Sequence, residues 1–194
     1  AETEMLVQAE ELEAEERLTV PSRRVPVPVL LPAPELCQTT GVALRAGMRI
    51  IIIADKAGVG SALAKKLRAK KIEVSMQKAG SSLNADPFAG QPVDGVYLLS
   101  ALDSEPALQD LTLEAWQALL DDRLFGLTRL LQALPNQPFL VTATRCGGLM
   151  GYEPDGAQNP TGGLVSGFTK ALARERPEVL IKTVDFEASA SAQD

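Results

Sequence analysis

The sequence contains no histidine among its 194 residues. Serine–histidine and cysteine–histidine catalysis need an imidazole as the general base, and most zinc sites use imidazole as a ligand. The absence of histidine therefore excludes these hydrolases and almost every zinc site. We expect no metal centre.

Aromatic residues, cysteines and long apolar runs are also scarce. Aromatic residues make up 4% of the chain, which predicts an aliphatic core. The two cysteines, Cys37 and Cys146, share no motif spacing, which favours two reduced thiols. No apolar run approaches the ~20 residues of a membrane span, and no secretory signal peptide is visible at the N-terminus. We therefore expect a cytoplasmic protein that binds no membrane.

The remaining composition is that of an ordinary globular chain, 45% hydrophobic and 23% charged. Its length fits one domain with an appended arm. The formal net charge of −6 argues against nucleic acid as a partner, because phosphate backbones are bound by clustered lysine and arginine.

Three segments follow one another along the chain. Residues 1–18 are acidic, with seven glutamates among the first sixteen positions, and indicate a solvated helix or linker or, alternatively, a docking arm. Residues 19–46 are rich in proline, which lacks an amide donor and so suits an extended arm or edge strand. Residues 47–194 alternate short apolar runs with amphipathic stretches, the pattern of a βα domain.

Within this domain, apolar runs predict parallel strands and stretches of helical periodicity predict the helices between them. The expected strands are residues 49–54, 72–76, 96–100, 139–144 and 181–186, and the expected helices are residues 61–70, 113–134 and 161–174. Residues 80–92 are rich in Gly, Ser, Asn, Asp and Pro and indicate a loop where a further strand–helix unit would be expected. The fold class is therefore α/β: a truncated Rossmann-like, mostly parallel sheet with helices on both faces.

Residues 141–172, VTATRCGGLMGYEPDGAQNPTGGLVSGFTKAL, resemble the active-site region of short-chain dehydrogenases/reductases. The resemblance places the catalytic Ser, Tyr and Lys of that family on Arg145, Gln158 and Gly162. In the helix at residues 113–134 it places the active-site Asn on Arg123. None of these four side chains can do the work of the residue it replaces, so we expect no catalytic residues in this chain.

The first βα turn resembles the cofactor loop of the same family, Thr-Gly-x-x-x-Gly-x-Gly. Residues 53–60 read IADKAGVG, which keeps Gly58 and Gly60 but places Ala54 and Asp55 at the early positions. A carboxylate beside a pyrophosphate is repelled by about 1 kcal/mol at 4 Å even in water. We interpret the loop as vestigial, serving packing rather than binding; the alternative is residual phosphate binding with help from Lys56.

The whole pattern is similar to the structural subdomain of a ketoreductase domain from a type I polyketide synthase or a polyunsaturated-fatty-acid-type synthase. The stretches that carry the likeness are residues 93–103 (VDGVYLLSALD), 139–148 (FLVTATRCGG) and 159–187 (NPTGGLVSGFTKALARERPEVLIKTVDFE). The resemblance implies a scaffold that binds no cofactor. It also implies an adjoining catalytic subdomain that binds NADPH and reduces a β-ketoacyl group. The implied partners are that subdomain, other synthase domains and, indirectly, the acyl carrier protein.

Two other functions remain open at this point. One is an active short-chain reductase that uses an atypical acid such as Tyr152, which predicts NADPH binding. The other is a free-standing pseudo-reductase that acts as a binding module, tethered by its acidic N-terminal arm.

Overall fold

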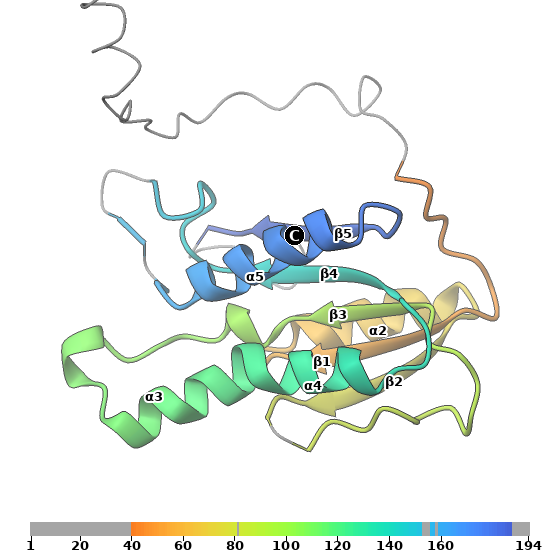
Figure 1. Cartoon of the computed structure of the whole chain (residues 1–194), viewed down its shortest axis with the longest axis horizontal. Coiled ribbons are helices and arrows are strands. Elements are labelled where there is room, and N and C mark those ends of the chain that lie inside the picture. Colours follow the sequence, from red (N-terminus) through yellow and green to blue (C-terminus); the bar gives the residue numbers. More distant parts are fainter. Residues whose placement is uncertain (1–39, 81, 153–155, 158, 188–194) are drawn as a thin grey trace, which may run out of the picture. The chain divides into compact units, whose positions relative to one another are not determined.

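A parallel sheet forms the centre of the domain in the computed structural model (Figure 1). The structure describes residues 40–80, 82–152, 156–157 and 159–187. The predictions for residues 1–18, and for all of 19–46 except residues 40–46, therefore lie outside the described residues. The sheet has the order β2-β1-β3-β4-β5, with every neighbouring pair parallel. Its strands are β1 (Arg49–Ala54), β2 (Glu73–Lys78), β3 (Gly95–Leu98), β4 (Phe139–Thr144) and β5 (Ile181–Asp185).

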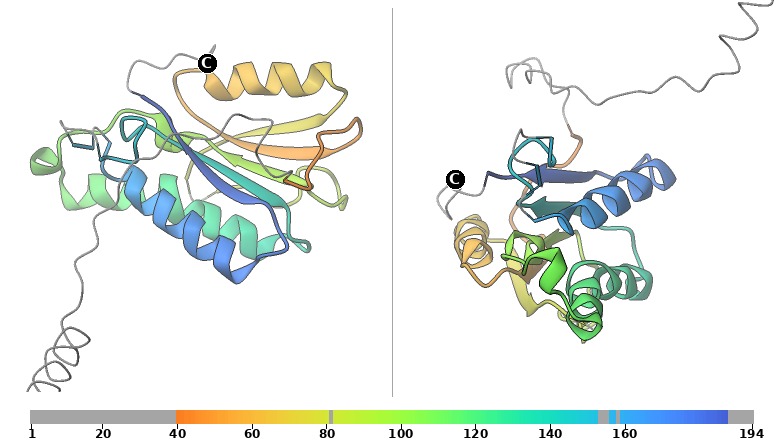
Figure 2. Two further views of the ribbon diagram at one scale, coloured as in Figure 1. Left: turned by 90° about the horizontal axis from the view of Figure 1, so that it is seen from above. Right: turned by 90° about the vertical axis from the view of Figure 1, so that its left-hand side faces the viewer.

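The helices connect the strands and lie on both faces of the sheet. α2 joins β1 to β2, while α3, η4 and α4 lie between β3 and β4, and α5 joins β4 to β5. Figure 2 shows α2 on one face and α4 with α5 on the other. The bounds are α2 (Val59–Ala69), η2 (Ser100–Leu102), η3 (Leu108–Asp110), α3 (Leu113–Leu120), η4 (Asp121–Phe125), α4 (Gly126–Ala133) and α5 (Gly162–Glu175).

The core is aliphatic, as the composition predicts, and consists of one layer on each face of the sheet. β1 separates the two layers: Ile51 and Ile53 contribute to the layer under α4 and α5, while Ile50 and Ile52 contribute to the layer under α2. All four isoleucines are 0% exposed. A strand buried on both faces needs apolar side chains at consecutive positions, which explains the uninterrupted apolar run.

The predicted fold class, a truncated Rossmann-like parallel sheet with helices on both faces, is confirmed. The sheet is truncated because a strand–helix unit is missing between β2 and β3. The described residues between β2 and β3 contain no helix, so β2 is an edge strand of this sheet. The element bounds agree with the sequence-based ones within about two residues, apart from one helix. The expected continuous helix over residues 113–134 is interrupted by η4, a turn of π-helix that carries Arg123. None of the described helices is long and apolar enough to cross a membrane.

The first residue of β3 is small and the first residue of β4, beside it in the sheet, is large. Gly95 and Phe139 are register partners, and a Cβ atom on Gly95 would overlap the Phe139 ring. That ring also packs edge-on against Tyr97, with centroids 5.7 Å apart. The position therefore requires glycine because of a neighbouring side chain.

We expect Gly95→Ala to destabilise the domain by about 1–3 kcal/mol, as overpacking does in a filled core. Replacing Phe139 with leucine should relieve much of that loss in the double variant. Gly163→Ala is the control: Gly163 is exposed in α5 with nothing within 4 Å of an added Cβ, and alanine there should be neutral or stabilising. Urea unfolding measures all three. Equal effects of Gly95→Ala with and without Phe139 would contradict the overlap.

Candidate functional site

The carboxyl ends of the strands meet at one end of the sheet, where open α/β sheets bind their ligands. The chain leaves β1 toward β2 on one side and β3 toward β4 on the other, so the crevice of the fold lies above β1 and β3. Apart from Gln158, which lies outside the described residues, the positions singled out from the sequence belong to loops, helix ends and the π turn at this end of the sheet. The structure shows what each of them contacts.

Asp55 occupies the beginning of α2. Its carboxylate accepts hydrogen bonds from the backbone N–H groups of Val59, at 3.0 Å, and Gly60, at 2.7 Å. These groups belong to the first turn of the helix, where N–H groups lack partners and the helix dipole favours negative charge. An anion bound by this loop would use the same groups. The sequence predicted only that Asp55 would repel a phosphate. In the structure its carboxylate also accepts from the N–H groups that a bound anion would use.

The two glycines of the loop have different structural roles, one in backbone conformation and one in packing. Gly58 has a φ of 99°, a backbone conformation that side chains rarely adopt. A Cβ on Gly60 would lie 3.2 Å from the Cβ of Ala54, so α2 approaches the end of β1 closely. The turn between β1 and α2 is therefore tight, and the Asp55 carboxylate lies at the first turn of the helix.

A second aspartate ties this loop to the one that follows β3. The backbone N–H of Lys56 donates to the carboxylate of Asp103 at 2.7 Å. Between β3 and Asp103, residues Ser100–Leu102 form a turn of 3-10 helix. Leu102, the last residue of this turn, is 3% exposed and belongs to the core layer under α2. The tight turn directs its side chain inward.

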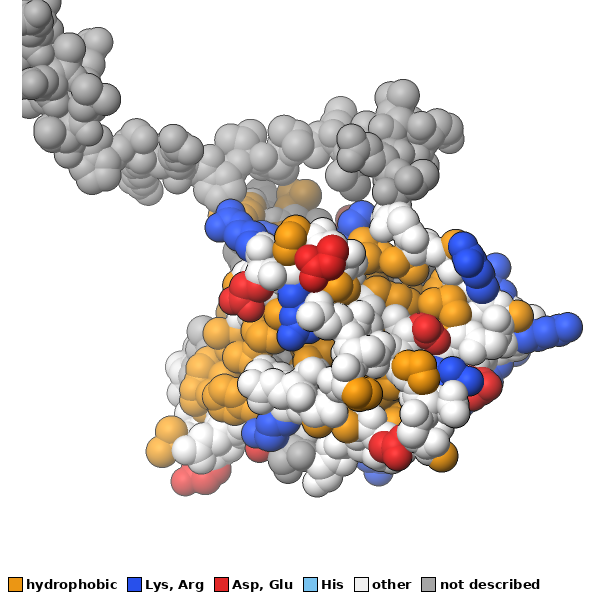
Figure 3. All heavy atoms as spheres, turned by 45° about the vertical axis from the view of Figure 1, so that its right-hand side comes forward, with side chains coloured by type: hydrophobic (Ala, Val, Ile, Leu, Met, Phe, Trp, Pro, Cys, Tyr) orange, Lys and Arg blue, Asp and Glu red, His pale blue; other side chains and the backbone are white. Residues whose placement is uncertain are grey.

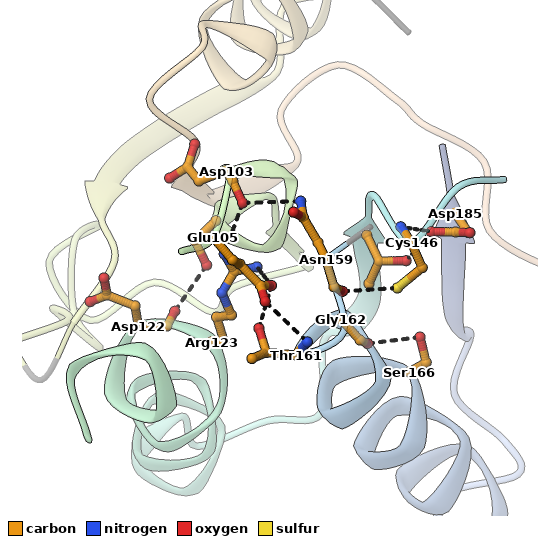
Figure 4. Close-up of polar contacts among 12 residues, drawn as sticks. Asp103, Glu105, Asp122, Arg123, Cys146, Asn159, Thr161, Gly162, Ser166 and Asp185 are labelled. Carbon is orange, nitrogen blue, oxygen red and sulfur yellow. Dashed lines mark hydrogen bonds and ion pairs between the residues drawn. The ribbon is translucent and has the colours of Figure 1, made fainter. Parts of the chain in front are cut away.

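Arg123 forms a buried ion pair with Glu105 (Figure 4). The Nη1–Oε1 distance is 3.3 Å and the side chains are 2% and 1% exposed. Arg123 Nη2 also donates to the backbone carbonyl of Asp103 at 2.9 Å. Burial lowers the pKa of Arg123, and the negative charges of Glu105, Asp103 and Asp122 act in the opposite direction. The guanidinium stays charged at neutral pH because its ordinary pKa is so high.

The ion-pair partner of Arg123 is not one of the acids nearest to it in the sequence. Asp121 instead pairs with Arg129 at 2.7 Å on the surface, and Asp155 lies outside the described residues. The π turn places Arg123 at an inward-facing position of the helix. Glu105 carries no motif that would have identified it, since it lies in an irregular loop.

The same glutamate holds the beginning of α5. Thr161 donates to the Glu105 carboxylate through its backbone N–H, at 3.2 Å, and through its hydroxyl. Asn159 donates to the carbonyl of Asp103 at 3.3 Å. Figure 4 shows how these contacts join the loop after β3, the π turn and the start of α5 around one carboxylate.

Gly162 leaves no space for a lysine or for any other side chain. A Cβ added there would lie 2.5 Å from the sulfur of Cys146 and 3.2 Å from the Cβ of Thr144. Cys146 is buried and its Sγ contacts the carbonyl of Asn159 at 3.4 Å. The position is therefore glycine because α5 begins directly against the end of β4.

The loop after β4, which begins with Arg145, is organised by Asp185 at the end of β5. The Asp185 carboxylate accepts hydrogen bonds from the Thr144 hydroxyl and the Cys146 N–H, each at 2.7 Å. It also accepts from the N–H groups of Gly148 and Met150, each at 2.8 Å. Arg145 is partly buried at the start of this loop. Nothing in the sequence marks Asp185 for this role beyond its place at a strand end.

The two remaining positions are Gln158 and Tyr152. Gln158 lies outside the described residues. Tyr152 is 57% exposed in the loop before α5. Its side chain is therefore largely in contact with solvent.

No family model and no curated protein matches the sequence. Solved structures do match. A short-chain dehydrogenase/reductase described as a glucose/ribitol dehydrogenase, from Brucella melitensis, has a TM-score of 0.54 at 18% identity; the match covers 73% of this chain and 75% of that one. A short-chain type dehydrogenase/reductase from Mycobacterium marinum has a TM-score of 0.56 at 16% identity, covering 75% and 77%.

A gluconate 5-dehydrogenase from Burkholderia cenocepacia, solved with NADP and tartrate, has a TM-score of 0.56 at 14% identity, covering 73% of this chain and 72% of that one. Likenesses at such low identity establish the fold. The domain has the Rossmann-like fold of the short-chain dehydrogenases/reductases, in a truncated form.

The contact of Asp55 with α2 predicts a measurable loss of stability on its removal. Asp55→Ala should destabilise the domain by about 1–2 kcal/mol, because two N–H groups lose their acceptor. Asp55→Asn keeps one acceptor oxygen and should lose less, with the difference shrinking at high salt as the charge–dipole term is screened. Urea unfolding at low and high salt tests this. An alanine variant as stable as the parent chain would contradict it.

The ion pair predicts strong coupling between its two members. Glu105→Gln should destabilise the domain by about 3–5 kcal/mol, because it leaves the buried Arg123 charge without a counter-charge. Adding Arg123→Met should recover much of this loss, since glutamine still accepts from Thr161 and no buried charge remains. The measurement is a double-mutant cycle in urea. Simple additivity of the two substitutions would show that the pair is not coupled.

Proposed function

We propose that this chain is a structural subdomain that supports the catalytic, NADPH-dependent β-ketoacyl ketoreductase half of a polyketide or fatty-acid megasynthase. It carries out no reduction itself. The observation that carries the proposal is the crevice at the carboxyl ends of the strands. Carboxylates of the chain itself, Asp55, Asp103 and Glu105, take the interactions that a cofactor and a substrate would need there.

The cofactor position supports this assignment. The gluconate 5-dehydrogenase and a short-chain dehydrogenase, both from Burkholderia cenocepacia, were solved with NADP bound. In the present chain a dinucleotide's diphosphate would have to displace the Asp55 carboxylate from Val59 and Gly60. The Asp103–Lys56 contact, which ties the loops after β1 and β3, would also have to open. NADPH binding is therefore assigned to the adjoining catalytic subdomain.

The catalytic positions support it as well. Reduction of a carbonyl needs a proton donor with a pKa brought toward neutrality, for which a tyrosine beside a lysine is suited. Gly162 cannot be replaced by a longer residue without moving Cys146, and Arg123 is committed to Glu105. Tyr152 is exposed and is followed by Gly156 where a lysine one helical turn on would be needed. These facts count against the alternative of an active reductase with atypical residues.

The surface supports a role in association. α3 has the sequence LEAWQALL but no buried residue, and its main contacts are with the adjoining π turn η4. It extends past the carboxyl ends of the strands (Figure 1). Leu113 and Phe125 are 66% and 45% exposed. Exposed apolar surface of this kind marks interaction sites, and Figure 3 shows another face on which hydrophobic side chains form patches between charged ones.

The partner at this surface is the catalytic subdomain, with other synthase domains and the acyl carrier protein associated through it. A free-standing pseudo-reductase module would use the same apolar surface. The two functions differ in one respect: the activity of a reductase depends on the structural subdomain, but not on the free-standing module.

The first expected result concerns the chain alone. NADPH titrated into the chain up to millimolar concentration should change neither the cofactor fluorescence nor the melting temperature. Saturable binding would favour the atypical reductase and overturn the proposal.

The second expected result concerns the complete synthase polypeptide. Leu113→Glu should lower its rate of β-ketoacyl thioester reduction severalfold, because a charge is placed in the contact between the subdomains. Gln132→Glu adds the same charge at an exposed position of α4 and should leave the rate unchanged. Full activity of the Leu113→Glu variant would exclude α3 as the contact.

A further inference from the structure

An apolar groove lies beside α2, on the face of the sheet that this helix covers. Its floor includes Tyr97 and Val141, and its outer side is formed by Val184 and Phe186. Val184 is 43% exposed, and the other three side chains are partly buried. These apolar side chains are thus open to contact from outside the described domain.

The groove exists because the two faces of the sheet are covered unequally. Parallel sheets are normally covered by helices on both faces. Here α4 and α5 lie on one face, while α2 is the single helix on the other among the described residues (Figure 2). The uncovered strip runs beside α2 over β3, β4 and β5. A helix laid alongside α2 would cover it.

The size of the groove also favours a polypeptide. Its volume is about 190 Å³, whereas sites for small molecules and cofactors usually measure about 300–1,000 Å³. At about 30 Å³ per water molecule the groove holds roughly six waters. It therefore fits a few apolar side chains from one face of a helix.

Two lysines border the groove on opposite sides. Lys66 of α2 is the one charged residue among the described residues that line it. Lys182 of β5 is the register partner of Val141, so its side chain is on the same face of the sheet. Both lysines are exposed. The apolar strip thus lies between two positive charges.

The positive charge extends along the end of α2. Residues 65–71 read KKLRAKK, and all five of their lysine and arginine side chains are exposed. None of the five forms an ion pair with another residue of the described part of the chain. This excess is local, because the whole chain has a formal net charge of −6. Exposed charge of one sign attracts and orients partners of the opposite sign.

We propose that this surface, made of the groove, Lys182 and residues 65–71, binds an acidic amphipathic helix of a partner protein. The apolar face of the helix packs on Val141 and Val184. Carboxylates on the two borders of that face lie near Lys66 and Lys182. An amphipathic helix in a hydrophobic groove is a recurring mode of recognition. The inference does not depend on the proposed function, because it uses only the contacts and charges of the α2 face.

Other anionic partners match this surface less well. A nucleic acid would contact the cations through its phosphates and would leave the apolar strip exposed to water. An anionic membrane would attract the same lysines, but its broad surface would not fill a groove. The apolar strip between the cations therefore favours the helix.

The probe is a synthetic peptide of about 18 residues, which is long enough to form a helix in water. It carries leucines on one face, glutamates on both borders of that face, alanines elsewhere and a fluorophore at one end. Titration with the 194-residue chain should raise its fluorescence anisotropy to saturation. A matched peptide with alanine at every leucine position should bind about tenfold more weakly, because it has no apolar side chains for the groove. No saturable binding, or equal binding of the two peptides, would overturn the inference.

Charge reversal in the chain locates the contact. Lys66→Glu and Lys182→Glu should each weaken peptide binding about tenfold, because each places a carboxylate opposite a glutamate. Lys170→Glu is the matched control, since Lys170 is exposed on α5 on the other face of the sheet, and it should leave the affinity unchanged. All three positions are exposed, so the variants should remain folded. Equal affinities of all three variants would contradict the proposed surface.

Thiol labelling tests whether the groove itself is covered. Val184→Cys should react with maleimide severalfold more slowly when the peptide is saturating, whereas Gln132→Cys, exposed on α4, should react at the same rate. Mass spectrometry of proteolytic fragments separates these thiols from the natural cysteines. Unchanged labelling of Val184→Cys would overturn the inference. Labelling without peptide that is as slow as that of the buried Cys146 would also overturn it, because the chain itself or a second copy would then cover the groove.

Competition distinguishes the helix from partners that carry phosphate. Duplex DNA, and vesicles of phosphatidylcholine with phosphatidylserine, are added to the complex of chain and labelled peptide at physiological ionic strength. Neither should displace the peptide. Displacement by either competitor would identify a phosphate-bearing partner and overturn the choice of a helix.

Discussion

The buried charge of Arg123 is the constraint on which the functional end of this domain depends. A guanidinium that is 2% exposed needs a counter-charge, because an unpaired charge in the interior costs several kcal/mol. Glu105 provides it, and its remaining oxygen capacity is used by Thr161. One carboxylate thereby holds three segments: the loop after β3, the π turn and the start of α5. These three segments are thereby joined at the carboxyl ends of the strands.

The same solution recurs at the other positions around the crevice. Asp55 satisfies the first turn of α2, Asp103 satisfies the backbone of the β1 loop, and Asp185 satisfies the N–H groups of the loop after β4. In a protein that binds a ligand, such N–H groups are left available, and the stability that the ligand adds grows with the logarithm of its concentration. An internal carboxylate stabilises the loops permanently. The consequence is that these N–H groups already have acceptors within the chain.

The polar groups at the crevice have partners within the chain, whereas other surfaces are incompletely covered. α3 has no buried residue, and the strip beside α2 leaves Val184 and Tyr97 partly exposed on a parallel sheet. Both features have an energetic cost in isolation, since apolar area in contact with water contributes nothing favourable to folding. They become favourable when a partner covers them. The described surface therefore keeps apolar side chains exposed at α3 and beside α2.

The sequence by itself determined the order of strands and helices and the truncation. Apolar runs such as residues 49–54 report burial on both faces, and helical periodicity is a local property of the chain. Its resemblance to the reductase family also predicted that the catalytic residues are replaced at Arg123, Arg145, Gln158 and Gly162. The tertiary structure decided why. The pairing of Arg123 with Glu105 depends on a π turn that periodicity does not reveal, and the glycine at 162 is required by Cys146, sixteen residues earlier in the chain. Burial and contact between distant residues set those roles, because ion pairs and steric limits depend on distances in space that local sequence does not contain.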